Sequence, residues 1–263
     1  MPEGAVSVVA GVERLETTDG PLFAVIGVFD GIHVGHQYLL RHLVSDARRR
    51  GARAAVITFD SHPDEILVGA APPLLVDPSE RLRLLGEAGV EVVIVQHFDA
   101  ALRATEYDDF VHRITSRTSL AGLLMTPDTA FGHDRRGTAD ALASLGDKEG
   151  FDVVVVPPFA VDDRPVSSSE IRRRVTTGDL AGAAELLGRP YSIVATAGED
   201  GLLDVAMPVA LPPAGTYRAV VECRGVSEPR PAILTVGEGA SLRLQPPGGE
   251  TSGTPIQVAF EGG

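Results

Sequence analysis

Two histidines, His33 and His36, are the residues of this sequence best suited to chemistry on a phosphate group. They frame a His-Val-Gly-His tetrapeptide that closely follows an Asp30-Gly31 pair. Two imidazoles three positions apart in one turn can face the same anion, as hydrogen-bond donors or, when protonated, as cations. Gly31 and Gly35 permit positive φ and place no Cβ in the way of a phosphate. The spacing therefore predicts an anion-binding turn.

The segments on either side of this turn have the patterns of a strand and a helix. Residues 22–29 form an apolar run with no charge before Asp30, which is typical of a strand buried on both faces of a parallel sheet. A helical pattern then covers residues 37–50. A strand, a glycine-bearing turn and a helix N-terminus together direct free backbone N–H groups and the positive end of the helix dipole at a bound anion.

Two other interpretations of the histidine pair are open at this point. The histidines could form half of a zinc site, although the sequence offers no matching ligand cluster and its single cysteine, Cys223, is distant. They could also be loop histidines whose nitrogens bond to the backbone. The position after a buried strand, with glycine on both sides, favours the phosphate interpretation.

The composition is that of an ordinary globular protein. The chain has 263 residues, 44% hydrophobic and 22% charged, enough for one large domain or a domain with a small companion. A net charge of −13 argues against nucleic acid or an anionic membrane as a partner, because both require basic patches. One cysteine excludes an internal disulfide and fits a reducing compartment. Neither a signal-peptide pattern nor an apolar run of membrane-spanning length is present, so we expect a cytoplasmic protein.

Strand patterns and helix patterns alternate through the first 190 residues. This alternation predicts a doubly wound α/β layer, in which ligands bind at the carboxyl edge of a parallel sheet. The predicted strands after the first are residues 53–59, 91–95, 121–125 and 153–156. Further helices are predicted after the Asp77 cap, at residues 107–117 and 139–150, after a serine cluster at residues 167–169 and after the Asp179 cap. The Ser-x-x-Glu pattern of that cluster is also a common helix cap without any other role.

The character of the sequence changes at Tyr191. Short β-like runs broken by Pro and Gly follow, without a helical period, and predict a small antiparallel barrel or sandwich. We therefore expect two domains, residues 1–190 and residues 191–263. The predicted strands of the second are residues 202–205, 217–222, 232–236, 242–244 and 256–260.

Four short motifs occur in order along the first domain. They are Gly-Val-Phe-Asp-Gly-Ile-His-Val-Gly-His at residues 27–36, Thr-Phe-Asp-Ser-His-Pro at 58–63, the loop Thr-Pro-Asp-Thr-Ala-Phe-Gly at 126–132 and Ser-Ser-Ser-Glu-Ile-Arg at 167–172. With these motifs, most of residues 20–195 resembles the adenylyltransferase module of prokaryotic FAD synthetases. That module is an HxGH nucleotidyltransferase of Rossmann-like fold, so the resemblance implies this fold for the predicted parallel sheet.

The resemblance also implies an activity and residue roles. In that family ATP and FMN give FAD and pyrophosphate, usually with Mg²⁺. His33 and His36 would hold the ATP phosphates and stabilise charge at the α-phosphorus, and Arg172 would grip the leaving pyrophosphate. The residues implied to bind the nucleotide are Gly27, Phe29, Asp30, Gly31, Gly35, Ser168 and Ser169. Those implied to bind the flavin or other acceptor are Asp60, His62, Asp128 and Phe131. The metal ligands stay unassigned, with Asp30 and Asp60 as candidates.

The chain departs from the family pattern in the third motif, where Thr126 and Thr129 replace a glycine and a phenylalanine. Ser61 and Ser169 replace a proline and a threonine elsewhere. The lost aromatic at Thr129 concerns the acceptor and leaves ATP binding untouched. Two alternatives to FMN adenylyl transfer therefore stay open. One is a nucleotidyltransferase acting on a different phosphorylated acceptor, and the other is a non-catalytic nucleotide- or flavin-binding protein.

Bifunctional FAD synthetases carry a riboflavin kinase barrel after this module, with a Gly-Phe-Pro-Thr-Ala-Asn motif that holds phosphate and magnesium. The corresponding stretch here is Ala-Met-Pro-Val-Ala-Leu at residues 206–211. Val209 and Leu211 have neither the hydroxyl nor the amide that this binding requires. The resemblance therefore implies a degenerate barrel without kinase activity.

Overall fold

The computed structural model describes residues 6–161, 164–223, 228–246 and 253–261. The chain divides into two units, each with a hydrophobic core of its own. We call the first the sheet unit; it comprises Met1–Phe29, Gly35–Pro72 and Leu82–Pro165. The second is the barrel unit, with Asp30–Val34, Pro73–Arg81 and Val166–Gly263. Both units are therefore built from segments that are discontinuous in sequence.

A parallel sheet of six strands, counted over the described residues, forms the centre of the sheet unit. Its strand order is β1-β4-β3-β2-β5-β6. The sheet confirms the predicted doubly wound layer and adds β1, a strand too short to carry a sequence pattern. The strands are β1 (Ser7–Val9), β2 (Leu22–Ile26), β3 (Arg53–Phe59), β4 (Val92–Gln96), β5 (Leu120–Met125) and β6 (Asp152–Val155). Strand β2 ends at Ile26, because the predicted continuation to residue 29 leaves the ladder and enters the turn.

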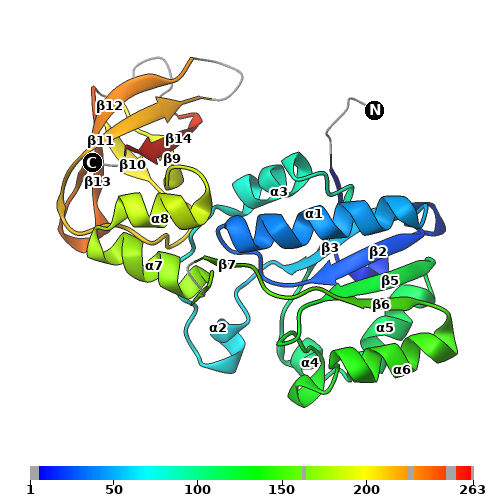
Figure 1. Cartoon of the computed structure of the whole chain (residues 1–263). Coiled ribbons are helices and arrows are strands. Elements are labelled where there is room, and N and C mark those ends of the chain that lie inside the picture. The colour runs from blue at the N-terminus through cyan, green and yellow to red at the C-terminus, as the bar shows by residue number, and fades with distance from the viewer. Residues whose placement is uncertain (1–5, 162–163, 224–227, 247–252, 262–263) are drawn as a thin grey trace. The chain divides into compact units, whose positions relative to one another are not determined.

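Helices cover both faces of this sheet (Figure 1). Helices α5 (Tyr107–Thr115) and α6 (Ala139–Glu149) place Phe110, Ile114 and Leu142 in one core cluster with strand residues such as Leu22 and Ile57. Helices α1 (Val34–Arg49) and α3 (Pro78–Glu87) lie on the opposite face in Figure 1. Shorter helices are α2 (Asp64–Leu67), α4 (Ala100–Arg103), η1 (Val12–Arg14), η2 (Thr17–Asp19) and η3 (His133–Arg135).

The strand order contains a switch of direction at β2. From β2 the chain adds β3 and β4 on one side, and then returns to add β5 and β6 on the other. In open α/β sheets ligands bind in the crevice outside the carboxyl ends of the strands at such a point. The segments that follow β2 and β5 are therefore the expected walls of a binding site.

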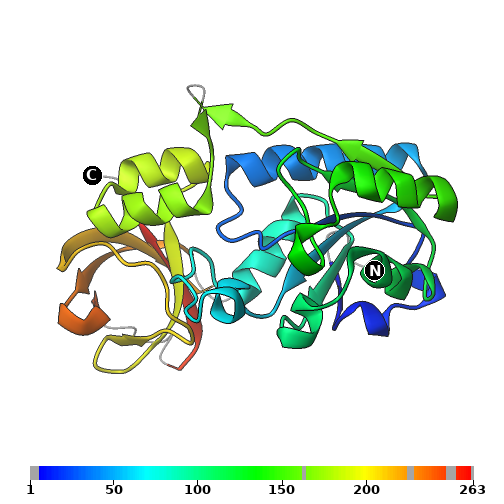
Figure 2. The ribbon, with the colours of Figure 1, turned by 90° about the horizontal axis from the view of Figure 1, so that it is seen from below.

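The second unit contains a closed antiparallel barrel, whose strands encircle the axis in Figure 2. The described strands follow the order β10-β13-β12-β11-β14-β9, which confirms the predicted C-terminal antiparallel β structure. They are β9 (Ser192–Ala197), β10 (Leu202–Asp204), β11 (Gly215–Glu222), β12 (Arg230–Val236), β13 (Leu242–Gln245) and β14 (Pro255–Phe260), with η4 (Glu238–Ala240) between β12 and β13.

Two helices that precede the barrel share its core. Helices α7 (Ser168–Thr177) and α8 (Leu180–Leu187) contribute Ile171, Val175 and Leu187 to the same cluster as Leu234 and Phe260 of the barrel. The caps are as predicted: Ser167 accepts a hydrogen bond from the Glu170 N–H, and Asp179 from the Gly182 N–H. A small hairpin of β7 (Ala160–Val161) and β8 (Arg164–Pro165) precedes α7. The division into domains at residue 190 stays a prediction.

The helices of the described residues all lack the combined length and apolar character that a membrane crossing requires.

Candidate active site

The turn after β2 has an unusual backbone. Phe29, Gly31 and Ile32 have φ angles of 54°, 81° and 41°, in the left-handed region that residues other than glycine rarely adopt. Helix α1 begins at Val34, three residues earlier than predicted, so that Gly35 is already helical. The positive φ predicted for both glycines therefore belongs to Gly31. Strained backbone of this kind is concentrated at functional sites.

His33 is almost fully buried, with 4% of its surface exposed. Burial lowers its pKa to about 4, and the charge of Arg189 contributes to the same shift. Arg189 donates hydrogen bonds to the carbonyl oxygens of Gly31, at 2.6 Å, and Ile32, at 3.1 Å, which fixes the guanidinium beside the turn. His33 is consequently neutral at pH 7, so its ring carries one N–H and one unprotonated nitrogen rather than a positive charge.

His36 lies in the first turn of α1, within the sheet unit. Its ring packs against Phe29, with 5.0 Å between ring centroids and an interplanar angle of 49°. Phe29 is itself buried, and its ring would lie 3.1 Å from a Cβ at Gly27. The glycine at position 27 therefore leaves room for the aromatic ring that orients His36.

Asp30 and Arg172 form an ion pair inside the barrel unit. Arg172 Nη2 donates to Asp30 Oδ2 at 2.9 Å, while Arg172 Nε donates to the Pro73 carbonyl at 2.7 Å. The Asp30 carboxylate also accepts from the backbone N–H of Leu75, at 2.9 Å, and of Val76, at 3.2 Å. Asp30 is 2% exposed, and the Arg172 side chain 13%. Three donor groups therefore already engage this carboxylate, and the predicted contact of Asp30 with a nucleotide stays a prediction.

The two predicted serines stand in the first turn of α7. Ser168 Oγ donates to the backbone carbonyl of Asp30 at 2.9 Å, which ties the helix to the turn. Ser169 is exposed at the same helix end. The N–H groups and dipole of this ten-residue helix favour an anion there. The barrel unit thus brings Asp30, Ser168 and Arg172 together, and His33 belongs to the same unit.

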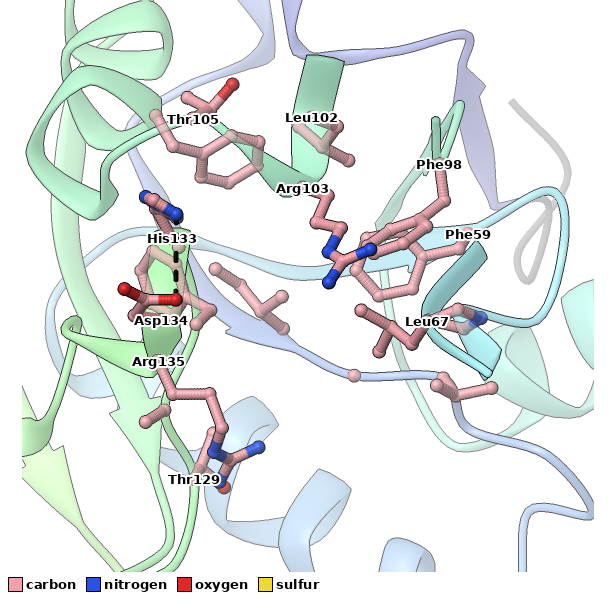
Figure 3. Close-up of a pocket in the computed structure, with 18 of the residues that line it drawn as sticks. Phe59, Leu67, Phe98, Leu102, Arg103, Thr105, Thr129, His133, Asp134 and Arg135 are labelled. Carbon is pink, nitrogen blue, oxygen red and sulfur yellow. Dashed lines mark ion pairs between the residues drawn. The ribbon is translucent and has the colours of Figure 1, made fainter. Parts of the chain in front are cut away.

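A pocket of about 650 Å³ lies in the sheet unit at the carboxyl ends of its central strands (Figure 3). Four of the predicted site residues line it, namely Gly27, His62, Asp128 and Phe131. Its walls are largely aromatic and aliphatic, with charged groups at intervals. The other lining residues include Phe59, Leu67, Phe98, Leu102, Arg103, Thr105, Phe110, His133 and Arg135.

Asp60 is outside the described lining of this pocket. Its carboxylate instead lies 2.6 Å from His97 Nδ1 and accepts from the Phe98 N–H at 3.2 Å. Partial burial opposes ionisation of Asp60, but the hydrogen bonds from His97 and Phe98 outweigh it and lower the pKa of Asp60. The same hydrogen bond and charge raise the pKa of His97. Since Phe98 lines the pocket and packs edge-on against Phe59, the structure favours Asp60 as a support for this aromatic wall.

The loop of the third motif closes on itself through its two threonines. Thr126 Oγ1 and Thr129 Oγ1 lie 2.6 Å apart, and the Thr129 N–H donates to the Thr126 carbonyl at 3.0 Å. Further along, Asp134 and Arg135 both have positive φ, 52° and 56°. Arg135 Nη2 donates to the Asp128 carbonyl at 2.9 Å, which links this strained segment back to the loop.

Sequence reasoning missed several residues of the pocket, above all Phe98 and Arg103. Phe98 closely follows β4. The rule that ligands bind at the carboxyl edge of a parallel sheet, which pointed to Asp60 after β3, could therefore also have identified Phe98. Arg103 ends the four-residue helix α4, which has no detectable period. In Figure 3 its side chain points into the pocket beside the rings of Phe59 and Phe98. Within the described part of the chain its guanidinium forms neither a hydrogen bond nor an ion pair.

The described residues contain no group of three or more His, Cys, Asp or Glu side chains placed to hold a metal ion. The carboxylates of both candidate ligands, Asp30 and Asp60, are committed to donors within the protein. These residues therefore do not fit a metal site made by the protein alone.

A doubly wound sheet, a ligand pocket at its switch point and the His-x-Gly-His turn after its central strand define an HxGH nucleotidyltransferase. A comparison with known families is more specific, because residues 15–170 match the model of FAD synthetase. The chain belongs to the FAD synthetase family.

Curated relatives agree with this assignment. The chain is 35% identical over 170 residues to the bifunctional riboflavin kinase/FMN adenylyltransferase of Haemophilus influenzae, a match that covers 64% of this chain and 55% of the relative. Proteins of the same name from Pseudomonas fluorescens and Escherichia coli K12 are each 30% identical. Those matches cover 87% and 81% of this chain, and 77% and 71% of the relatives. The chain thus spans about half of the first relative's length and about three quarters of the others'.

The fold of the whole chain has a counterpart among solved structures. A crystal structure titled macrolide-efflux protein, from Streptococcus pneumoniae, superposes with a TM-score of 0.80, covering 97% of this chain and 89% of the other. The two sequences are 23% identical, so the likeness concerns the fold alone.

Proposed function

We propose that the chain is an FMN adenylyltransferase that transfers AMP from ATP to FMN, giving FAD and pyrophosphate. The observation that carries the proposal is the aromatic pocket at the switch point of the sheet, in a chain of the FAD synthetase family. Phe59, Phe98, Phe110 and Phe131 offer ring faces and edges to a planar heterocycle such as isoalloxazine. His62 and Asp128 supply polar groups in the same lining.

The nucleotide is proposed to bind to the turn after β2 and to the N-terminus of α7. Neutral His33 would donate one N–H to a phosphate oxygen, and His36 would provide a second imidazole. Arg172, whose Nη1 is left available by its bonds to Asp30 and Pro73, would take the β- and γ-phosphates together with Ser169. Guanidinium groups suit this task because their charge persists at every physiological pH.

The reaction does not require a general base. The acceptor phosphate is already ionised at pH 7 and attacks the α-phosphorus, while the bond between the α-phosphorus and the oxygen that bridges it to the β-phosphorus breaks and releases pyrophosphate. What the protein must supply is alignment of the two substrates and preorganised donors for the developing charge. Loss of one such donor typically costs about 10²–10³ in rate.

We propose that Mg²⁺ enters with ATP. This ion commonly keeps several waters and binds through substrate phosphates with one or two protein carboxylates. Such binding agrees with side chains that form no metal site of their own among the described residues.

We further propose that the barrel has no riboflavin kinase activity. Val209 and Leu211 occupy the positions of the hydroxyl and amide residues of the kinase motif, and both pack against the hydrophobic core of the barrel unit. The backbone of the same stretch is engaged in pairing with Leu74. Both facts argue against phosphate binding at this place.

A second function is favoured by the hydroxyl pair of Thr126 and Thr129, which stands where the family has an aromatic residue. It is adenylyl transfer to a different phosphorylated acceptor. Tight ATP binding without turnover would instead indicate a non-catalytic protein.

The deciding experiment is chromatography of the reaction products of purified protein with ATP and Mg²⁺, given FMN in one tube and riboflavin in another. FAD from FMN, with riboflavin unchanged, is the expected result. FMN or FAD formed from riboflavin would overturn the proposed loss of the kinase. Consumption of neither flavin would overturn FMN as the acceptor.

A further inference from the structure

The stretch that corresponds to the kinase motif pairs with a segment from a distant part of the sequence. Leu74 donates its N–H to the Pro208 carbonyl at 2.9 Å and accepts from the Ala210 N–H at 2.8 Å. These bonds form a parallel bridge between Leu74 and Val209. We call residues 73–76 the strap. Since all these residues belong to the barrel unit, the strap is a part of that unit although it lies more than a hundred positions away in sequence.

The strap continues directly to the ion pair of the nucleotide site. The N–H groups of Leu75 and Val76 donate to the carboxylate of Asp30, while the Pro73 carbonyl accepts from Arg172 Nε. The 2.9 Å hydrogen bond between Asp30 and Arg172 completes a closed network of contacts with the strap. Arg172 is thus held at Nε by one end of the strap, and at Nη2 by a carboxylate that the other end holds.

Tyr191 supports the strap indirectly, by a hydrogen bond to the stretch that pairs with the strap. Its hydroxyl donates to the Ala210 carbonyl at 2.5 Å, and the residue is fully enclosed in the core cluster that contains Leu75. Burial raises the pKa of Tyr191, and the negative charge of Asp30 contributes to the same shift. The positive charge of Arg172 opposes this shift.

We propose that the C-terminal barrel is a positioning element for adenylyl transfer, in which the Pro208–Ala210 edge and Tyr191 fix the strap, and the strap fixes Arg172 through Asp30. This inference rests on the proposed function. The inference gives a role to residues 208–210, which lack the side chains of the kinase motif. Their backbone N–H and C=O groups still form hydrogen bonds with the strap. A guanidinium held at two of its nitrogens keeps its third nitrogen oriented, so that little freedom has to be lost when the phosphates bind.

Two tyrosines of the barrel allow a matched test. Tyr191 and Tyr217 each donate to a backbone carbonyl, Ala210 at 2.5 Å and Pro213 at 2.6 Å. Each packs against Phe260 at 5.7 Å between centroids. Only the bond of Tyr191 reaches a residue that itself pairs with the strap, because the Ala210 N–H donates to the Leu74 carbonyl. Tyr191→Phe should raise the KM for ATP about three- to tenfold, whereas Tyr217→Phe should leave it unchanged. Equal KM values for ATP in both variants and wild type would overturn the proposal.

A double-mutant cycle tests the path through Asp30. Asp30→Asn keeps the shape of the side chain but removes its charge, and should weaken ATP binding measured by calorimetry about tenfold. FMN binding should stay the same, because its proposed pocket lies in the sheet unit. In an Arg172→Ala background, Asp30→Asn should produce no additional loss of ATP affinity. Independent, additive losses would overturn the inference.

The outcomes separate this inference from the proposed function. Wild-type protein that binds ATP but makes no FAD would contradict the proposed acceptor, and the double-mutant cycle, which is measured as ATP binding by calorimetry, would still test this inference. Wild-type protein that makes FAD, with variants that all behave alike, would contradict the inference alone. Wild-type protein that fails to bind ATP would overturn both.

Discussion

The hydroxyl oxygens of Thr126 and Thr129 lie 2.6 Å apart and join the two ends of the first turn of the pocket loop. The backbone bond between the same two residues, 3.0 Å from nitrogen to oxygen, reinforces this closure. Thr129 lines the pocket, so the hydroxyl pair sets the shape of one wall. The loop is held here by polar contact at the position where the family has an aromatic side chain.

Thr126→Val should therefore weaken FMN binding without affecting ATP. Valine has nearly the same shape as threonine, and the change removes one hydrogen bond worth about 1 kcal/mol, or roughly a fivefold rise in the KM for FMN. The measurement is steady-state kinetics with each substrate varied in turn. Thr115→Val, in α5 and outside the pocket lining, is the control. An unchanged KM for FMN would show that the hydroxyl pair does not shape the pocket.

Arg103→Ala should lower the affinity for FMN about tenfold. Its guanidinium points into the pocket beside two phenylalanine rings (Figure 3), where it can donate to the carbonyl edge of a flavin. Quenching of FMN fluorescence gives the affinity directly and needs no turnover. Arg117→Ala removes an exposed arginine elsewhere and should bind FMN like the wild type. Equal affinities of both variants would exclude Arg103 from the acceptor site.

The Asp60–His97 pair predicts a pH-dependent stability. The pKa of His97 is raised above 6.5 by Asp60, so its contribution is complete below about pH 6.5 and lost as pH rises through the folded-state pKa. The pKa of Asp60 is lowered below 3.8, so its contribution is lost only under more acidic conditions. The Tm of His97→Asn should consequently fall below that of wild type at pH 5.5 and approach it at about pH 9. A Tm difference independent of pH would contradict an ionic pair.

His33 should titrate near pH 4 in the folded protein. Because the unfolded chain takes up this proton near pH 6.5, acidification from 6.5 to 4 should destabilise the fold by roughly 3 kcal/mol through this residue. Histidine NMR spectra recorded against pH provide the midpoint, and His33→Gln identifies the signal. A midpoint near 6.5 would mean that His33 is accessible and can carry a charge at the active site.

Much of the fold was predictable because its patterns are local. The buried runs that became β3 and β5, the caps at Ser167 and Asp179, and the loss of helical period at Tyr191 each reflect chemistry within a few residues. The glycine turn and its histidines were found in the same way.

The contacts of Asp30 and the position of Arg103 were not accessible by such reasoning. Asp30 is defined by contacts to Leu75 and Arg172, at separations of 45 and 142 positions, which no local pattern encodes. Arg103 belongs to a helix of four residues, too short for a period. The predicted acceptor contact of Asp60 remains untested, and its position beside His97 supports an indirect role.

The discontinuous make-up of the barrel unit affects the order in which the protein can fold during synthesis. All described strands of the parallel sheet are complete once residue 155 has been made. Asp30 and the strap are made early as well, yet their partners Arg172 and Ala210 appear only later in translation. The growing chain must therefore carry an unmatched carboxylate and an unpaired strap until the ribosome has passed the start of the barrel. The network of contacts around Arg172 can therefore close only after residue 210 has been made.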